Sequence, residues 1–372
     1  MPGDRTLITE LVTALGMTGC SNHEAAIREQ PAALAITADD WESLKRVSSA
    51  GAYSRLACVA FQNGVFFANH HDGLNGRVPQ QIEWSGGRRI PGDQPVPADL
   101  LVDRVYMISC KYLSRILYNT SPARIFDEAL GSTFVSRYPD WYQLTAPKEH
   151  DALYRRTITE LGLKGMPETA RKLDTKHRLK FKHALKKHQE ANSTRGVPAE
   201  ARTEYKKLID SVSRRTAVRW RKTLQHRRQW KLMLWRLLRI YSSTYFILGI
   251  DLESRQTMRL RVMTPWEWQK SYKLLSFELF AASKGQPRVD WVAEYLHRPT
   301  ENQDKVCGHI EIRWSHGPFM GAPEAKAYLD TPHQQVPGYE HLAMGETVNS
   351  TMEATVGPAY RYNQLILKES KA

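Results

Sequence analysis

Residues 95–130, PVPADLLVDRVYMISCKYLSRILYNTSPARIFDEAL, hold the pattern on which the expected fold depends. The apolar run 105–108 leads directly into Ser-Cys-Lys at 109–111, which is typical of a β-strand that ends on a lysine. The later run 121–130 starts with Ser and Pro, in the order found at the beginning of helices. A strand ending on Lys111 and a following helix are therefore predicted.

Asp99 and Lys111 are the residues of this stretch that could carry chemistry. Alternation along a strand places Ser109 and Lys111 on one face, while the carbonyl of Cys110 can point at an ion held by Asp99. Mg²⁺ prefers such oxygen ligands, and a nearby lysine can orient the water that attacks a phosphodiester. The competing interpretation is a solvated lysine at a strand end, with Asp99 as a turn residue.

The PAD at 97–99 with the SCK at 109–111 resembles the motif of the PD-(D/E)xK nuclease superfamily, whose core is a helix, a β-sheet and a helix. Here an alanine separates the proline from Asp99, and Ser109 stands where the family usually has Glu or Asp. A branch of restriction endonucleases has Ser, Thr or Cys at that position. The resemblance covers about residues 20–130 and implies an Mg²⁺-dependent nuclease.

The same resemblance implies that a carboxylate from another element completes the metal site, because Ser109 supplies no charge. In the branch with Ser, this acid comes roughly a dozen positions after the lysine. Asp127 and Glu128 lie sixteen and seventeen positions after Lys111. Glu24, on the helix expected before the sheet, is the other candidate.

Three rival sites are present in the sequence. Asp103 is a rival for the first carboxylate, but it leaves only six positions to the serine, which is short for a hairpin. Glu324 and Lys326, with Asp290 upstream, form a second acid-x-lysine without an apolar strand leading into it. The His-His-Asp within 69–75, flanked by asparagines, suggests a histidine-metal nuclease, although the turn-rich surroundings favour a solvated loop.

Positive charge is concentrated in one third of the chain. Residues 151–240 hold 25 Lys and Arg and 8 Asp and Glu, while the whole chain carries +14, so the remainder sums to −3. Like charges four positions apart on a helix repel each other, so this concentration indicates a surface for a polyanion. The residues expected to contact phosphates are Lys176, Lys180, Arg214, Arg215, Arg219, Arg221 and Arg227.

The order of elements predicts an α/β (α+β) fold, with a restriction-endonuclease-like mixed sheet flanked by helices. The start of the chain is expected to form short helices, one of them opened by Ser21, and the apolar runs between 51 and 111 to form short strands. One long helix is expected over about 203–240, after a linker at 144–150. The expected segments are 1–50, helical; 51–145, the nuclease-like core; 146–240, basic and helical; and 241–372, a mixed α/β part that completes the core sheet or forms its own domain.

The longest charge-free apolar run near the middle, 240–250, has eleven residues, against about twenty needed to span a bilayer. The four cysteines show no CxxC pairing, which argues against a disulfide framework or a zinc site and favours a cytoplasmic protein. With the resemblance, these features predict a DNA endonuclease of restriction or antiphage defence that pairs as a homo-oligomer, with RNA as the alternative substrate. The main rival is a non-catalytic DNA-binding subunit with a degenerate nuclease core.

Overall fold

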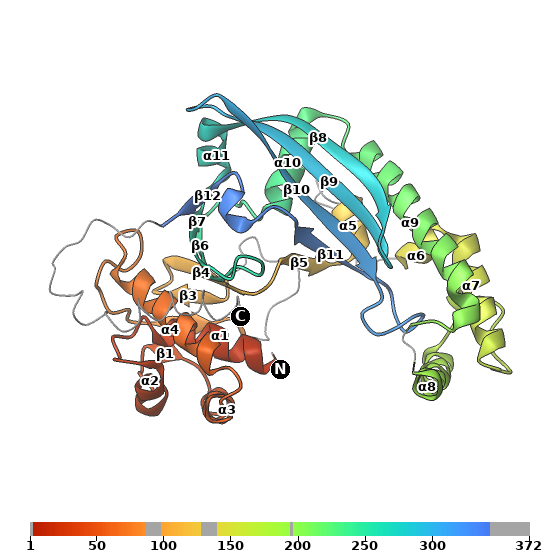
Figure 1. The fold of residues 1–372 in the computed structure, drawn as a ribbon, viewed down its shortest axis with the longest axis horizontal. Helices are drawn as coiled ribbons and strands as arrows, with labels where there is room; N and C mark the ends of the chain where they lie inside the picture. The colour runs from red at the N-terminus through yellow and green to blue at the C-terminus, as the bar shows by residue number, and fades with distance from the viewer. Residues whose placement is uncertain (1–2, 87–97, 128–139, 194–195, 343–372) are drawn as a thin grey trace, which may run out of the picture.

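The protein folds around two β-sheets, which the computed structural model describes over residues 3–86, 98–127, 140–193 and 196–342. Sheet A has seven strands in the order β1-β2-β3-β4-β6-β7-β12, and sheet B has five in the order β5-β11-β10-β9-β8. Helices lie against both sheets (Figure 1). This arrangement confirms the mixed α and β class.

Sheet A contains the strand on which the prediction was centred. β4 pairs in parallel with β6 and antiparallel with β3, and the register sets Lys111 beside Gly249. The predicted strand that ends near Lys111 is confirmed, since Lys111 is the penultimate residue of β4. The strands of sheet A are β1 (Leu34–Ala35), β2 (Ile82–Trp84), β3 (Leu100–Val102), β4 (Tyr106–Tyr112), β6 (Tyr245–Ile250), β7 (Thr257–Val262) and β12 (Tyr339–His341).

N-terminal helices cover one face of sheet A and bury its apolar side chains (Figure 1). The strands expected between 55 and 69 are wrong, because these residues form a helix, α4. Its apolar side chains pack in the core that α1 and the strands share. α1 and α4 cross closely at Gly16 and Gly64, where an added Cβ would lie 2.1 Å from a facing carbonyl oxygen. These helices are α1 (Asp4–Leu15), α2 (His23–Glu29), α3 (Ala38–Ser49) and α4 (Ser54–Asn69).

Sheet B has helices along one face, and α9 is the longest of those described (Figure 1). The apolar stripe of α9, including Leu208, Val212 and Trp220, is buried in the same core as the strands of sheet B. The strands are β5 (Ile116–Thr120), β8 (Tyr272–Ser283), β9 (Pro287–His297), β10 (Asn302–Arg313) and β11 (Glu324–Leu329). The remaining helices are α5 (Pro122–Phe126), α6 (Trp141–Thr145), α7 (Pro147–Glu160), α8 (Thr175–Asn192), α9 (Arg202–Thr223), α10 (Arg227–Leu237) and α11 (Pro265–Ser271).

Three local expectations are wrong. The single helix expected over 203–240 is two helices, because α9 ends at Thr223 and α10 begins at Arg227. The expected linker at 144–150 is mostly helical, with only Ala146 between α6 and α7. α2 is capped by Asn22, whose side chain accepts the N–H of Ala25, rather than by Ser21.

The two sheets do not follow the order of the expected segments. Sheet A takes β1 from 1–50, β2 to β4 from 51–145, and β6, β7 and β12 from 241–372. β4 and β5 are consecutive in the chain but belong to different sheets, so the sheets are joined at this point. The four-segment division stays a prediction. Across the described ranges, each helix is too short or too polar to cross a lipid bilayer.

Candidate metal site and basic groove

Asp99, Ser109 and Lys111 share one face of sheet A. Their neighbours Leu100 and Ile108 are fully buried against the N-terminal helices, so the pleat turns these three residues the other way. Asp99 and Ser109 are buried, with 3% and 1% of their surface exposed, and Lys111 is half-buried. The structure therefore brings the three nominated residues to one side of the sheet.

Asp99 is held against the backbone of β4. Its N–H donates to the carbonyl of Ile108 at 2.7 Å, and its carboxylate accepts the N–H of Cys110. The N–H and C=O of one residue in a strand point to the same edge, so the Cys110 carbonyl is also directed toward Asp99 and away from β6. A carboxylate and a carbonyl at one edge are oxygen donors of the kind that Mg²⁺ takes.

The hydroxyl of Ser109 is buried and has no hydrogen-bond partner among the described residues. A buried polar group left without a partner costs about 1–3 kcal/mol. A bound ion or an ordered water beside Asp99 would remove that cost. The orphaned oxygen is therefore an observation that fits a polar ligand at this place.

Asp251, which sequence reasoning missed, comes directly after β6. Because Lys111 lies beside Gly249, Asp251 falls two positions further on the same face of the sheet. Its side chain is buried, and Oδ1 accepts the N–H groups of Glu253 and Ser254 at 2.9 and 2.8 Å. An acid that follows the wholly buried strand 245–250 was a readable signal for this residue.

His333 lies next to Asp251, with Nδ1 3.9 Å from Oδ2, and is 3% exposed. Burial lowers the pKa of His333 to about 4, and the charges of Lys111 and Arg115 act in the same direction against the opposing effect of Asp251. The imidazole is therefore neutral at pH 7. Lys111, whose Nζ donates to the carbonyl of Ile116 at 3.3 Å, lies close enough for its charge to act on the ring.

A buried network on the opposite face fixes the ends of β4 and β6. Asn63 of α4 donates to the carbonyl of Gly249 and to the hydroxyl of Tyr112, both at 3.2 Å. Its side-chain oxygen accepts from Nε of Arg259 at 3.0 Å, and Thr13 contacts the Tyr112 hydroxyl at 2.7 Å. Hydrogen bonds on the face opposite Lys111 therefore fix the position of β4 relative to β6.

The structure does not bring two of the nominated carboxylates to Asp99. Glu24 is exposed on α2, in the helical layer over the other face of sheet A, and it contacts His23 at 3.2 Å. Asp127 follows α5, and its two carboxylate oxygens accept from Nε and Nη2 of Arg219 at 2.5 and 2.8 Å. Glu128 lies outside the described residues. Of the acids considered, Asp251 is the one that follows a strand of sheet A on the same face as Lys111.

The acid-x-lysine of β11 does not form a site with its upstream aspartate. Glu324 begins β11, whereas Asp290 is level with Tyr328, four positions along the sheet, and pairs with Arg288. Asp103 lies in the turn between β3 and β4, and its carboxylate accepts the N–H groups of residues 80 and 81. Asp290 and Asp103 are therefore already engaged by an arginine and by backbone N–H groups.

His70, His71 and Asp72 follow α4 and place their ligand atoms within 4.8 Å of one another. They lie in a turn, as the sequence around them predicted, and the two histidine rings lie side by side with centroids 4.3 Å apart. Nδ1 of His70 accepts the backbone N–H of Asp72 at 3.1 Å, so that nitrogen already closes the turn. This group could hold a metal only through its remaining ligand atoms.

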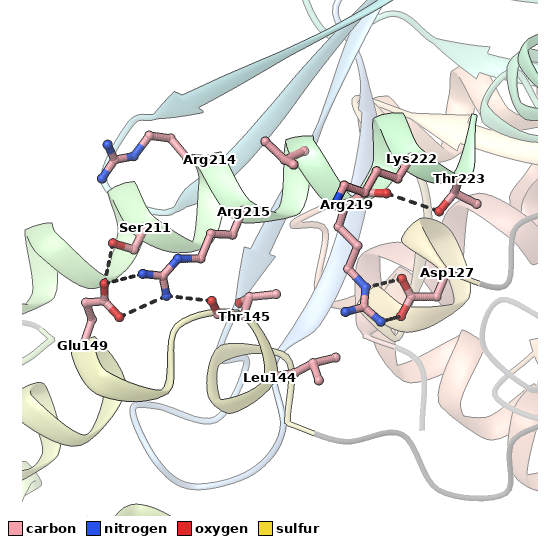
Figure 2. A pocket seen from close by; sticks show the side chains of 11 residues that line it. Asp127, Leu144, Thr145, Glu149, Ser211, Arg214, Arg215, Arg219, Lys222 and Thr223 are labelled. Carbon is pink, nitrogen blue, oxygen red and sulfur yellow. Dashed lines mark hydrogen bonds and ion pairs between the residues drawn. The ribbon is translucent and has the colours of Figure 1, made fainter. Parts of the chain in front are cut away.

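An open groove of about 950 Å³ runs along the outer side of α9. Arg214, Arg215, Arg219 and Lys222 line it from positions that recur on one side of the helix. Figure 2 shows Arg215 and Arg219 each reaching a carboxylate. The groove is therefore basic but partly neutralised in the free protein.

The carboxylates in the groove occupy sites that a phosphate could take. Glu149 accepts from Arg215 at 2.9 and 3.2 Å, and Asp127 accepts from both nitrogens of Arg219. Arginine forks bind carboxylate and phosphate by the same paired geometry. Among the groove's described cations, Arg214 has only a weak bond to its own helix, at 3.4 Å.

The other four nominated residues differ in what they contact. Arg221 donates to the carbonyl of Leu279, and Arg227 donates to that of Leu275 at 2.9 Å. β8 is an edge strand, so these two arginines cover its exposed carbonyls. On α8, Lys176 is exposed, and Lys180 donates to the carbonyl of Lys164 at 2.6 Å.

No protein-family model matches the sequence, and neither a curated protein nor a solved structure is significantly similar to it.

Proposed function

We propose that the protein is a metal-dependent nuclease that hydrolyses phosphodiester bonds of DNA. The observation that carries the proposal is the shared face of sheet A, on which Asp99, Ser109 and Lys111 lie and on which Asp251 follows β6, the parallel neighbour of β4. The alternative substrate is RNA. The PD-(D/E)xK resemblance supports the proposal through three of these four residues.

Asp99, the carbonyl of Cys110 and Asp251 are the groups that would hold the ion. Mg²⁺ supplies, when bound, stabilisation of the negative charge that develops on the phosphate oxygens. Lys111 orients the attacking water, and His333, which burial keeps neutral, adds no positive charge beside it. Asp251 supplies the negative charge that Ser109 lacks.

The test is cleavage of plasmid, single-stranded DNA and RNA with Mg²⁺, Mn²⁺ or EDTA. Lys111→Ala should lower the cleavage rate by about 10²–10⁴-fold, the range for losing a group that assists proton transfer. Asp99→Asn and Asp251→Asn keep the hydrogen bonds to Cys110 and to the turn after β6, so they remove charge with little change in fold. Each variant should bind DNA in Ca²⁺ as the wild type does.

Lys326→Ala is the matched control, because it removes a lysine of the rival acid-x-lysine. Its cleavage rate should equal that of the wild type. Full cleavage by Lys111→Ala, with loss in Lys326→Ala, refutes the assignment and moves the site to Glu324 and Lys326.

A non-catalytic DNA-binding subunit is the second candidate. It is favoured by the serine at position 109 and by the ion pair that Asp127, one of the expected metal ligands, forms with Arg219. The absence of cleavage by wild type with either metal, together with salt-dependent DNA binding, would select it. Reversal of Arg214 and Lys222 to Glu tests the groove, since neither forms an ion pair among the described residues. Binding should weaken for all sequences alike.

A further inference from the structure

A second basic surface, separate from the α9 groove, lies where α10 and α11 meet the edge strand β8. It is a pocket of about 320 Å³. Its cationic side chains are Arg227, Arg228, Lys231, Lys273 and Arg298, and no carboxylate lines it within the described part of the chain. The α9 groove, by contrast, holds two carboxylates among its lining residues.

The five cations come from three places in the chain, so their meeting is a product of folding. Arg227 and Arg228 are the first residues of α10, with Lys231 one turn later. Lys273 belongs to β8, and Arg298 follows β9. The last two lie outside the basic third of the sequence, in the part whose charges sum to −3.

Neighbouring groups already orient part of this cluster. Arg227 donates to the carbonyl of Leu275 at 2.9 Å, and Nζ of Lys231 donates to Gln269 at 2.7 Å. Both partners are neutral and leave the positive charges uncompensated. The N-terminus of α10 adds the partial positive charge of its helix dipole. Cations held together in this way repel one another, and a multivalent anion relieves that repulsion.

We infer that this pocket binds a compact polyphosphate group, such as adjacent phosphates of a triphosphate or a nucleotide. The volume is at the lower end for small-molecule sites, about 300–1,000 Å³, and suits a short chain of phosphates. Three arginines offer paired donors for phosphate oxygens, and two lysines add point charges. Trp268, Tyr272 and Leu274 form its apolar wall. The inference does not depend on the proposed nuclease activity.

The experiment is calorimetric titration of the full chain with sodium triphosphate, in EDTA and about 50 mM salt, where phosphate contacts are strongest. Wild type should bind. Arg228→Glu and Lys273→Glu should each weaken binding at least tenfold, since both side chains are exposed and reversal replaces attraction by repulsion. Lys187→Glu, an equal charge reversal at an exposed position of α8, should leave the affinity unchanged.

The source of the phosphates is resolved by competition with two oligonucleotides of one sequence. If only the 5′-triphosphorylated strand displaces triphosphate, the pocket binds the phosphates of a chain end or of a free nucleotide. Equal displacement by the 5′-hydroxyl strand assigns it to backbone phosphates. No binding of triphosphate by the wild type, or equal weakening by Lys187→Glu, overturns the inference. Because EDTA removes metal, failure of the nuclease proposal leaves this result intact.

Discussion

His150 should make the protein unstable in mild acid. Its side chain is 1% exposed on α7, and neither ring nitrogen has a hydrogen-bond partner among the described residues. The rings of Phe319 and Trp314 lie 5.0 and 6.1 Å from the imidazole. Burial, followed by the charge of Arg178, lowers the pKa of His150 from 6.5 to about 4. The folded protein therefore holds this ring neutral.

The sign and size of the effect follow from proton linkage. Between pH 6.5 and 4, the unfolded chain binds a proton at this histidine and the folded chain does not, so the free energy of unfolding falls as the pH falls. Each pKa unit corresponds to about 1.36 kcal/mol, so the loss approaches about 3.4 kcal/mol well below pH 4, and about 2.8 kcal/mol of it occurs between pH 7 and pH 4. The contribution is nearly complete above about pH 7.5.

The assay is urea unfolding, followed by tryptophan fluorescence, at several pH values from 7.5 to 4. His150→Phe keeps an aromatic ring between Phe319 and Trp314 and removes the titrating group. Its free energy of unfolding should therefore fall by about 3 kcal/mol less than that of the wild type over this range. His183→Phe, at an exposed position of α8, is the control and should follow the wild type. Superimposable curves for wild type and His150→Phe would refute the reasoning.

Three further predictions concern the fold. Asn63→Leu leaves several buried polar groups unpaired and should lower the free energy of unfolding by about 3 kcal/mol or more in urea titrations. Gly64→Ala puts a Cβ 2.1 Å from a backbone oxygen and should cost at least about 1–3 kcal/mol by thermal unfolding, whereas Gly321→Ala, with nothing within 4 Å, should cost little. Replacing Arg221 and Arg227 together by Met should expose the carbonyls of β8 and promote self-association, measured by light scattering; a monodisperse variant at the wild-type mass contradicts this role.

The lysine strand was predictable because its signal is local. An apolar run that ends on Ser-Cys-Lys predicts that Ser109 and Lys111 share one face. On β4, Ile108, Cys110 and Tyr112 pack in the N-terminal core, whereas Met107 packs in the core of sheet B. α4 was misread because its run contains Val59, Val65 and several aromatic residues, which are frequent in strands, and because Gly64 is unfavourable in a helix. Only the crossing with α1 explains that glycine.

The carboxylate proposed to complete the metal site could not be found by counting positions from the lysine. Asp251 lies on the same face of sheet A as Lys111 because β6 pairs in parallel with β4, and this pairing joins residues far apart in the chain. The nominated Asp127 is close to the lysine in sequence, but Arg219 on a helix of the other sheet binds both of its oxygens. Basic residues were likewise counted as equivalent, although Arg221 donates a hydrogen bond to the backbone carbonyl of Leu279 and Arg214 bonds only weakly to its own helix. Partners of this kind depend on tertiary structure.

The parallel pairing of β4 with β6 also determines when the site can form during synthesis. Residues 113–244 separate β4 from β6 in the chain, so the ribosome must synthesise all of them before β6 can emerge and pair with β4. Until then β4 has an unpaired edge, and closing so long a loop is slow compared with forming the local helices. A nascent chain released early thus has the lysine but neither Asp251 nor its strand. The N-terminal helices and strands of sheet A cannot be expected to fold as an isolated fragment, and chaperone dependence should be greatest before residue 250 is synthesised.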